Sequence, residues 1–245
     1  TREQPIIENK PEDKFERVIF LPEGEGRLGE GGLRTQGYFK ISLLDKPLIT
    51  VVTVVFNGEK FLEETIQSVI NQTYDNVEYI IIDGGSTDGS LDIIREYEHA
   101  IDYWVSEGDS GIYDAMNKGL RVVTGSIVGF LNSDDFYHRD IIQYVHDNMA
   151  DYSYLACGVK RVGDVGGDKD ILPQHNIGDC FNKSCGMPFP HPGLFVLIST
   201  FKDLGVFRLR YKIASDMDFV YRMLNNGFLG KTSNKIASEL ACHAK

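Results

Sequence analysis

The sequence lacks the cysteine patterns of the common metal-binding modules. Its four cysteines include no Cys-x-x-Cys pair, and the spacing from Cys180 to Cys185 is not that of a common zinc knuckle. Isolated cysteines of this kind are typical of reduced thiols in a cytosolic protein, which is what we expect here.

Basic charge and long apolar runs are also scarce. The chain has 25 Lys and Arg against 36 Asp and Glu, a net charge of -11, so nucleic acid and anionic membranes are not expected as dominant partners. No apolar run is long enough to span a bilayer, and the start, TREQPIIENK, has no signal-peptide core. We therefore expect a soluble, cytoplasmic protein whose 42% hydrophobic residues can fill a core.

The chain begins with an irregular segment. Residues 1–46 are charged at first and then glycine-rich, without a sustained helical or strand period. Short strands are predicted there only at residues 17–21 and near residues 38–43. We interpret this segment as an extension that covers a sheet edge or mediates dimerisation, followed by one domain at residues 47–245.

From residue 47 onward, strand patterns alternate with helix patterns. The β-branched run PLITVVTVVF is typical of a strand that is covered on both faces of a parallel sheet. Further strands are predicted at residues 77–83, 102–106 and 126–131, and helices follow the first three strands. This order predicts an α/β protein with a mostly parallel sheet and right-handed crossovers.

Polar side chains come at the ends of these strands. Asn57 follows the first strand, Asp83 ends the second, and Asp134 and Asp135 follow the fourth. Ligands of open α/β sheets bind beyond the carboxyl ends of the strands, so this pattern indicates a binding site.

Simpler interpretations of these polar residues remain open. The loop DGGSTDG matches neither the dinucleotide nor the P-loop motif and could be a capped turn. The pair Asp134 and Asp135 could cap the next helix, or one of the two could bind a divalent cation together with substrate phosphates.

Several ordered motifs carry a resemblance to a known family. The succession TVVFNGEKFLEETIQSVINQTY, YIIIDGGSTDGS, SEGDSGIYDAMNKG and GSIVGFLNSDD resembles the nucleotide-sugar-binding half of a family 2 glycosyltransferase of the GT-A fold. The later stretch FPHPGLFVLISTFKDLGVFRLRYKIASDMDFVYRML is similar to the acceptor half. The resemblance implies an α/β fold with a mostly parallel central sheet flanked by helices, a donor half at residues 47–135, and an acceptor half at residues 136–245 with a smaller mixed region.

The resemblance also implies a donor site for a nucleoside diphosphate sugar. Its expected residues are Val54, Phe56, Asn57, Asp83, Asp109, Asn117, Asn132 and Ser133. Where the family has Asp-x-Asp, this sequence has Asn132, Ser133 and Asp134. The neutral Asn132 supplies no charge, so Asp134 is the expected ligand of Mg²⁺ or Mn²⁺, and metal affinity without nucleotide should be weak.

The resemblance places the catalytic base at Asp216, in the stretch ASDMDF. A carboxylate there would take the proton of the acceptor hydroxyl in one displacement that inverts the anomeric configuration. Taken alone, Asp216 could instead be a first-turn acid that interacts with the helix dipole. Residues His191, Asp135 and Asp218 are expected on the acceptor or diphosphate side.

The implied activity is transfer of one sugar to a glycan or lipid-linked acceptor in cell-surface polysaccharide biosynthesis. The Gln-x-x-Arg-Trp motif of processive members is absent, which favours addition of a single sugar. Contact with the inner face of a membrane through the acceptor, and a homodimer, are compatible with this activity. Two alternatives are a non-catalytic nucleotide- or carbohydrate-binding module and a sugar nucleotidyltransferase, although VVFNGEKF lacks the glycine-rich basic loop of the latter.

Overall fold

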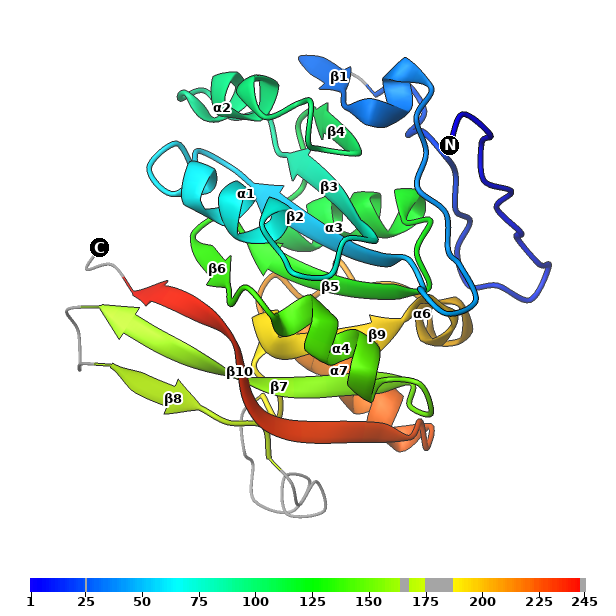
Figure 1. The fold of residues 1–245 in the computed structure, drawn as a ribbon, viewed down its shortest axis with the longest axis vertical. Coiled ribbons are helices and arrows are strands. Elements are labelled where there is room, and N and C mark those ends of the chain that lie inside the picture. Colours follow the sequence, from blue (N-terminus) through cyan, green and yellow to red (C-terminus); the bar gives the residue numbers. More distant parts are fainter. Residues whose placement is uncertain (25, 164–167, 175–186, 243–245) are drawn as a thin grey trace.

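The computed structural model describes residues 1–24, 26–163, 168–174 and 187–242. These residues form a ten-stranded sheet with the strand order β1-β4-β3-β2-β5-β9-β7-β10-β6, and β8 pairs with β7 (Figure 1). Cys157 is a buried free thiol, whereas Cys180 and Cys185 lie outside the described residues.

Four parallel strands form one half of the sheet, in the order β4-β3-β2-β5. They are β2 (Ile49–Val55), β3 (Val77–Asp83), β4 (Tyr103–Ser106) and β5 (Ile127–Asn132). Every residue of β2 and β3 is buried, as the continuous β-branched and isoleucine runs predict. The predicted parallel centre of the sheet is confirmed.

Helices cover both faces of the sheet, so the core consists of two apolar layers (Figure 1). On one face lie α1 (Leu62–Ile70), α2 (Ser90–Glu96) and α4 (Ile141–Asn148). On the other face lie α3 (Ile112–Val122), α6 (Ile198–Leu204) and α7 (Ser215–Asn225). Alternation along β2 separates the layers: Val52 and Val54 belong to the α3 layer, and Val51 and Val55 to the α1 layer.

The remaining strands make the other half of the sheet mixed. They are β6 (Asp135–Tyr137), β7 (Tyr154–Gly163), β8 (Lys169–Ile171), β9 (Leu194–Leu197) and β10 (Gly230–Cys242). Strand β9 is antiparallel to both β5 and β7, whereas β10 is parallel to β7 and antiparallel to β6. This arrangement confirms the expected mixed region beside a parallel core.

The N-terminal segment lies along the edge of the sheet. Strand β1 (Gly29–Gly31) pairs antiparallel with β4, and the 3₁₀ turn η1 (Leu33–Gln36) follows it. The edge of the sheet at β4 is therefore covered, one of the two roles considered for this segment. The strands predicted at residues 17–21 and 38–43 are wrong, because these residues pair with no strand in the described structure.

Within the described residues, no helix combines the length and the apolar character that crossing a membrane requires.

Candidate active site

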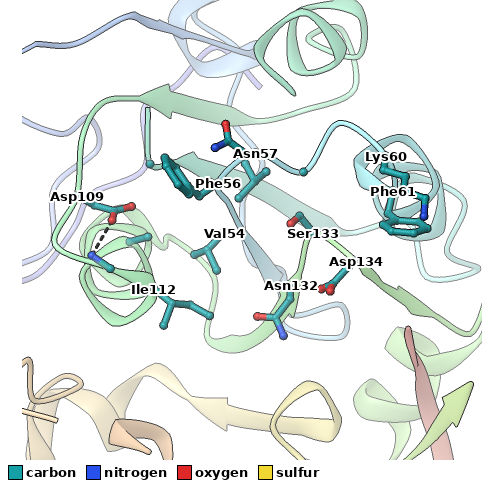
Figure 2. A pocket seen from close by; sticks show the side chains of 15 residues that line it. Val54, Phe56, Asn57, Lys60, Phe61, Asp109, Ile112, Asn132, Ser133 and Asp134 are labelled. Atoms are coloured by element: carbon teal, nitrogen blue, oxygen red, sulfur yellow. Dashed lines mark hydrogen bonds between the residues drawn. The ribbon is translucent and has the colours of Figure 1, made fainter. Parts of the chain in front are cut away.

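A cavity of about 780 Å³ opens at the carboxyl ends of β2 and β5 (Figure 2). Three segments line most of it: residues 54–61 at the end of β2, residues 109–115 at the start of α3, and residues 132–134 after β5. The parallel sheet brings these segments together because its strand ends share one edge. The wall includes the predicted metal ligand Asp134 and six of the predicted donor residues, Val54, Phe56, Asn57, Asp109, Asn132 and Ser133.

The stretch 132–134 is a tight turn between β5 and β6. Thr65 of α1 anchors it through a hydrogen bond of 2.9 Å to the Ser133 carbonyl. The Asn132 amide NH₂ donates to Asp135 at 3.0 Å, while its oxygen Oδ1 is buried and accepts no hydrogen bond from any described residue. Such an unpartnered buried oxygen in a cavity wall is suited to a ligand hydroxyl or a cation.

Asp135 is buried in the first position of β6 and does not line the cavity. The interpretation of Asp134 and Asp135 as a cap for α4 is wrong, because α4 begins after Asp140 and β6 intervenes. Asp134 remains in the cavity wall, where its carboxylate lies near Asn132 in Figure 2.

Asp83 is fully buried and does not line the cavity. Its carboxylate accepts hydrogen bonds from the Ser106 hydroxyl, the Ser86 hydroxyl and the backbone of Gly85 and Ser86. These four donors fix the loop after β3, and Gly84 of that loop reaches the cavity. A direct contact between Asp83 and a donor stays a prediction.

The side chains at the end of β2 and the start of α3 are held by local backbone groups. Asn57 has a φ of 54°, which asparagine tolerates, and its oxygen accepts a hydrogen bond from Thr87 at 2.8 Å. Asp109 accepts one from the Gly111 backbone at 2.7 Å (dashed in Figure 2). A Cβ at Gly84 would lie 2.4 Å from Asp109 Oδ2, so a side chain there would displace the Asp109 carboxylate.

The ionisable groups in the cavity wall include more acidic than basic side chains. Its only ionisable wall groups among the described residues are the carboxylates of Asp109 and Asp134 and the ammonium of Lys60, whose Nζ lies 4.6 Å from the Phe61 ring centroid. No group of three His, Cys, Asp or Glu among the described residues could hold a metal ion. A hard cation would therefore need ligand oxygens besides those of the protein.

Asp216 lies in the first turn of α7, where it contacts α3. The Tyr113 hydroxyl donates to Asp216 Oδ1 at 2.8 Å, and the Met217 backbone donates to the same oxygen at 2.9 Å. Tyr113 follows Ile112, which lines the cavity, so the hydrogen bond connects the cavity wall to the predicted base. Burial, and then the bond to Asp216, raises the pKa of Tyr113 to about 12, so this phenol keeps its proton near neutral pH.

His191 lies on the other side of Asp216, in the 3₁₀ turn η2 (His191–Gly193). Its Nδ1 is 3.8 Å from Asp216 Oδ2, and its ring stacks on Phe130 of β5 at 5.8 Å between centroids. Both ring nitrogens are buried without a hydrogen-bond partner in the described part of the chain. Burial lowers the pKa of His191 against the opposing charge of Asp216, so the imidazole is neutral at neutral pH.

Two predicted residues hold the loop between α6 and α7 instead of lining the cavity. Asp218 forms ion pairs with Arg208 at 3.1 Å and Arg222 at 2.8 Å. The Asn117 side chain exchanges two hydrogen bonds with the Phe207 backbone, at 2.8 and 2.9 Å.

Sequence reasoning missed Lys60, Phe61 and Gly84 as wall residues. Their proximity to Phe56, Asn57 and Asp83 in the sequence was the available signal, because a strand-end loop contributes several consecutive positions to a site.

A mixed α/β sheet with a cavity at the carboxyl ends of its parallel strands defines an α/β ligand-binding or enzyme fold. The model of the family described as glycosyl transferase family 2 matches residues 50–223. The chain therefore belongs to glycosyl transferase family 2, as the sequence motifs indicate.

Individual relatives agree with this family. Glycosyltransferase GlyA of Streptococcus pneumoniae is 35% identical over 42% of this chain and 15% of its own length. Chondroitin synthase of Escherichia coli is 33% identical over 45% of this chain and 16% of its own length. The chain thus spans less than a fifth of either relative.

A solved structure shows the same fold. The mannosyltransferase PcManGT of Pyrobaculum calidifontis, in complex with GDP-Man and Mn²⁺, has a TM-score of 0.62 and 21% sequence identity, covering 80% of this chain and 57% of that chain. The GT-A fold expected from the sequence motifs is thereby confirmed.

Proposed function

We propose that the chain transfers one sugar from a nucleoside diphosphate sugar to a hydroxyl of a glycan or lipid-linked acceptor, with inversion, in cell-surface polysaccharide synthesis. The observation that carries the proposal is the 2.8 Å hydrogen bond from Tyr113 to Asp216. It ties a carboxylate to the helix whose first residue, Ile112, lines the cavity. The similarity to chondroitin synthase and to the mannosyltransferase in complex with GDP-Man supports a polysaccharide product and a nucleotide-sugar donor.

The nucleotide half of the donor is assigned to the cavity. Phe56 and Ile112 remain 65% and 46% exposed there, which is unusual for apolar side chains in a wall and suits stacking or packing of a base and a ribose. Lys60 can offset part of the diphosphate charge.

Asp134 and the Asn132 oxygen fit a divalent cation. One carboxylate and one amide oxygen are hard ligands, and the diphosphate would complete the set, as is usual for Mg²⁺ and Mn²⁺ sites. When bound, the cation would neutralise charge that develops on the leaving diphosphate. The manganese in the mannosyltransferase complex is consistent with this assignment.

The chemistry assigned to the chain's own residues is a single displacement. Asp216 takes the proton of the acceptor hydroxyl while that oxygen bonds to the anomeric carbon. The bond from the anomeric carbon to the diphosphate oxygen breaks, and its electron pair leaves with the nucleoside diphosphate. Tyr113 holds one oxygen of Asp216 through its hydrogen bond, and the neutral ring of His191 lies beside the other carboxylate oxygen.

The experiment that tests this proposal is a donor screen. Calorimetry with several nucleoside diphosphates, with and without Mn²⁺, identifies the base, and assays of donor hydrolysis and transfer follow. We expect one nucleotide to bind at micromolar affinity in Mn²⁺ and its sugar conjugate to turn over. Binding without turnover across a broad donor panel would instead support a non-catalytic module.

A further inference from the structure

The loop between α6 and α7 has an unusual composition. Between Phe207 and Ala214 it contains no acidic residue, although the whole chain has a net charge of -11. Cationic and apolar or aromatic residues alternate through the loop as Arg208, Leu209, Arg210, Tyr211, Lys212 and Ile213. All six residues are exposed, so we call residues 208–213 the basic-apolar loop.

The apolar side chains of this loop are left in water. Ile213 is 87% exposed, Leu209 44% and Tyr211 38%. Single exposed apolar residues are normal on a protein surface, but three within six residues form a patch that is typical of an interaction site.

The cations of the loop are available to a partner. Arg208 is paired with Asp218, whereas Arg210 interacts with the Tyr211 ring and hydroxyl, with its guanidinium carbon 4.8 Å from the ring centroid. Neither Arg210 nor Lys212 forms an ion pair with any residue that the structure describes. Two unpaired cations beside three exposed apolar groups match a surface that is both anionic and apolar.

The position of the loop relates it to the candidate active site. Leu209, Tyr211 and Lys212 lie against residues 110–114 at the start of α3, next to the cavity wall. At its other end the loop leads directly into α7, where Asp216 is in the first turn. A partner bound to this loop would therefore be held close to the first turn of α7, which carries Asp216.

We propose that the basic-apolar loop docks on the surface of an anionic lipid bilayer and so brings the candidate site to lipid-linked acceptors. Lys and Arg are attracted to anionic headgroups, while Leu, Tyr and Ile enter the boundary between headgroups and acyl chains. A soluble phosphorylated glycan would use the cations but leave the apolar side chains in water, which is why a bilayer fits better. The negative charge of the remaining surface would confine attachment to this loop. The value of docking for catalysis rests on the proposed transfer reaction, whereas docking itself does not.

The test is binding of the full chain to vesicles. We expect it to sediment with vesicles of phosphatidylglycerol and phosphatidylcholine, more weakly in high salt, and not with phosphatidylcholine alone. Reversing the two unpaired cations (Arg210→Glu with Lys212→Glu) should weaken partitioning roughly 30-fold or more, since each contributes about 1 kcal/mol near an anionic surface. Replacing two apolar side chains (Leu209→Ser with Ile213→Ser) should weaken it by about tenfold.

Matched controls lie elsewhere on the surface. The pair Arg139→Glu and Lys169→Glu makes the same charge change at exposed positions, and Ile6→Ser with Leu44→Ser removes apolar groups that are even more exposed. Both control pairs should bind vesicles like the unaltered protein apart from a small general charge effect. Calorimetry with UDP and GDP on every variant verifies the fold and separates a failure of docking from a failure of the proposed function.

Three results would overturn the proposal. They are no binding of the unaltered protein to phosphatidylglycerol vesicles, equal losses in the loop and control variants, and displacement by inorganic pyrophosphate with no effect of the apolar replacements. The last result would identify a soluble phosphate ligand in place of the bilayer.

Discussion

Asn132 shows how one amide can serve two purposes. Its NH₂ group donates a hydrogen bond to Asp135, which keeps the turn at residues 132–134 in shape, and its oxygen accepts no hydrogen bond from the part of the chain that the structure describes. Asp134, two residues later, supplies the only carboxylate of the triplet. A cation at this turn would depend mainly on Asp134 and the donor phosphates.

We therefore predict that Asp134→Asn weakens nucleoside diphosphate binding in Mn²⁺ by about tenfold or more, as expected for the loss of an ionised metal ligand. Binding in EDTA should change little. Calorimetry under both conditions checks this, with Asp92→Asn as the control because Asp92 is an exposed carboxylate far from the cavity wall. Equal weakening in EDTA would assign Asp134 to direct contact with the nucleotide.

Asp216 combines the two interpretations that its sequence position allows. It is a first-turn acid that accepts the Met217 backbone hydrogen bond, and it also contacts Tyr113 and His191. The neutral, isosteric change Asp216→Asn should reduce transfer by roughly 10²- to 10⁴-fold, the usual contribution of a general base, while the nucleotide Kd stays within about twofold. A transfer assay and calorimetry on the same preparation measure both quantities. Full turnover by this variant would remove Asp216 as the base.

At the scale of elements, α3 and α7 form the link between the two halves of the site. Helix α3 begins in the cavity wall, α7 carries Asp216, and the Tyr113 hydroxyl joins them. Phe207 strengthens the same contact, since its backbone bonds to Asn117 and its ring lies 5.8 Å from that of Tyr113. Direct contacts thus join the cavity wall to the predicted base.

Removing only the hydrogen bond from Tyr113 to Asp216 should reduce turnover without weakening donor binding. We predict that Tyr113→Phe lowers kcat about tenfold, because a hydrogen bond to a carboxylate contributes roughly 1.5–3 kcal/mol, while KM for the donor changes less than about twofold. Steady-state kinetics measure kcat and KM separately. The control is Tyr152→Phe, at a partly exposed position outside the cavity. A parallel rise in KM would place Tyr113 in donor binding instead.

Across the whole molecule, the N-terminal segment is part of the folded domain. Arg34 is buried and forms an ion pair of 2.5 Å with Glu78 of β3, which also bonds to Thr50 and Thr124. Burial alone would raise the pKa of Glu78, but the charge of Arg34 and these hydrogen bonds outweigh it and lower the pKa. Nearer the N-terminus, the backbone N–H of Val18 donates a hydrogen bond to the Arg121 carbonyl of α3. The backbone N–H of Lys14 donates one to the Lys202 carbonyl of α6.

Breaking this buried pair should destabilise the entire fold. Arg34→Met leaves Glu78 buried without its cation, and we expect a loss of about 3–5 kcal/mol in the free energy of unfolding. Because the folded-state pKa of Glu78 is lowered, its stabilisation is present above the unfolded pKa and is lost as the pH falls through acid values toward the folded pKa. Urea unfolding at pH 7 and at pH 4 should show this acid loss in the unaltered protein and a smaller one in the variant.

The control for this prediction is Lys46→Met, which removes an exposed ion pair with Asp75 and should cost less than about 1 kcal/mol. Equal stability of the Arg34 variant and the unaltered protein at pH 7 would show that this buried ion pair does not stabilise the fold.

The sequence by itself determined the parallel centre and the edge where the site lies. Continuous apolar runs such as VEYIIID are buried only when both faces of the sheet are covered, and the polar residues at the strand ends then share one edge.

The edge strand β1 was not predicted because its glycines are required by packing. A Cβ at Gly29 or Gly31 would lie within 3 Å of the Trp104 ring, which no local sequence pattern reveals. Only the tertiary structure decided that Asp83 is a buried anchor, that Asp218 pairs with two arginines, and that Tyr113 reaches Asp216 across 103 positions of chain. Such contacts depend on how helices and loops pack across the sheet, and residue type and spacing do not encode that packing locally.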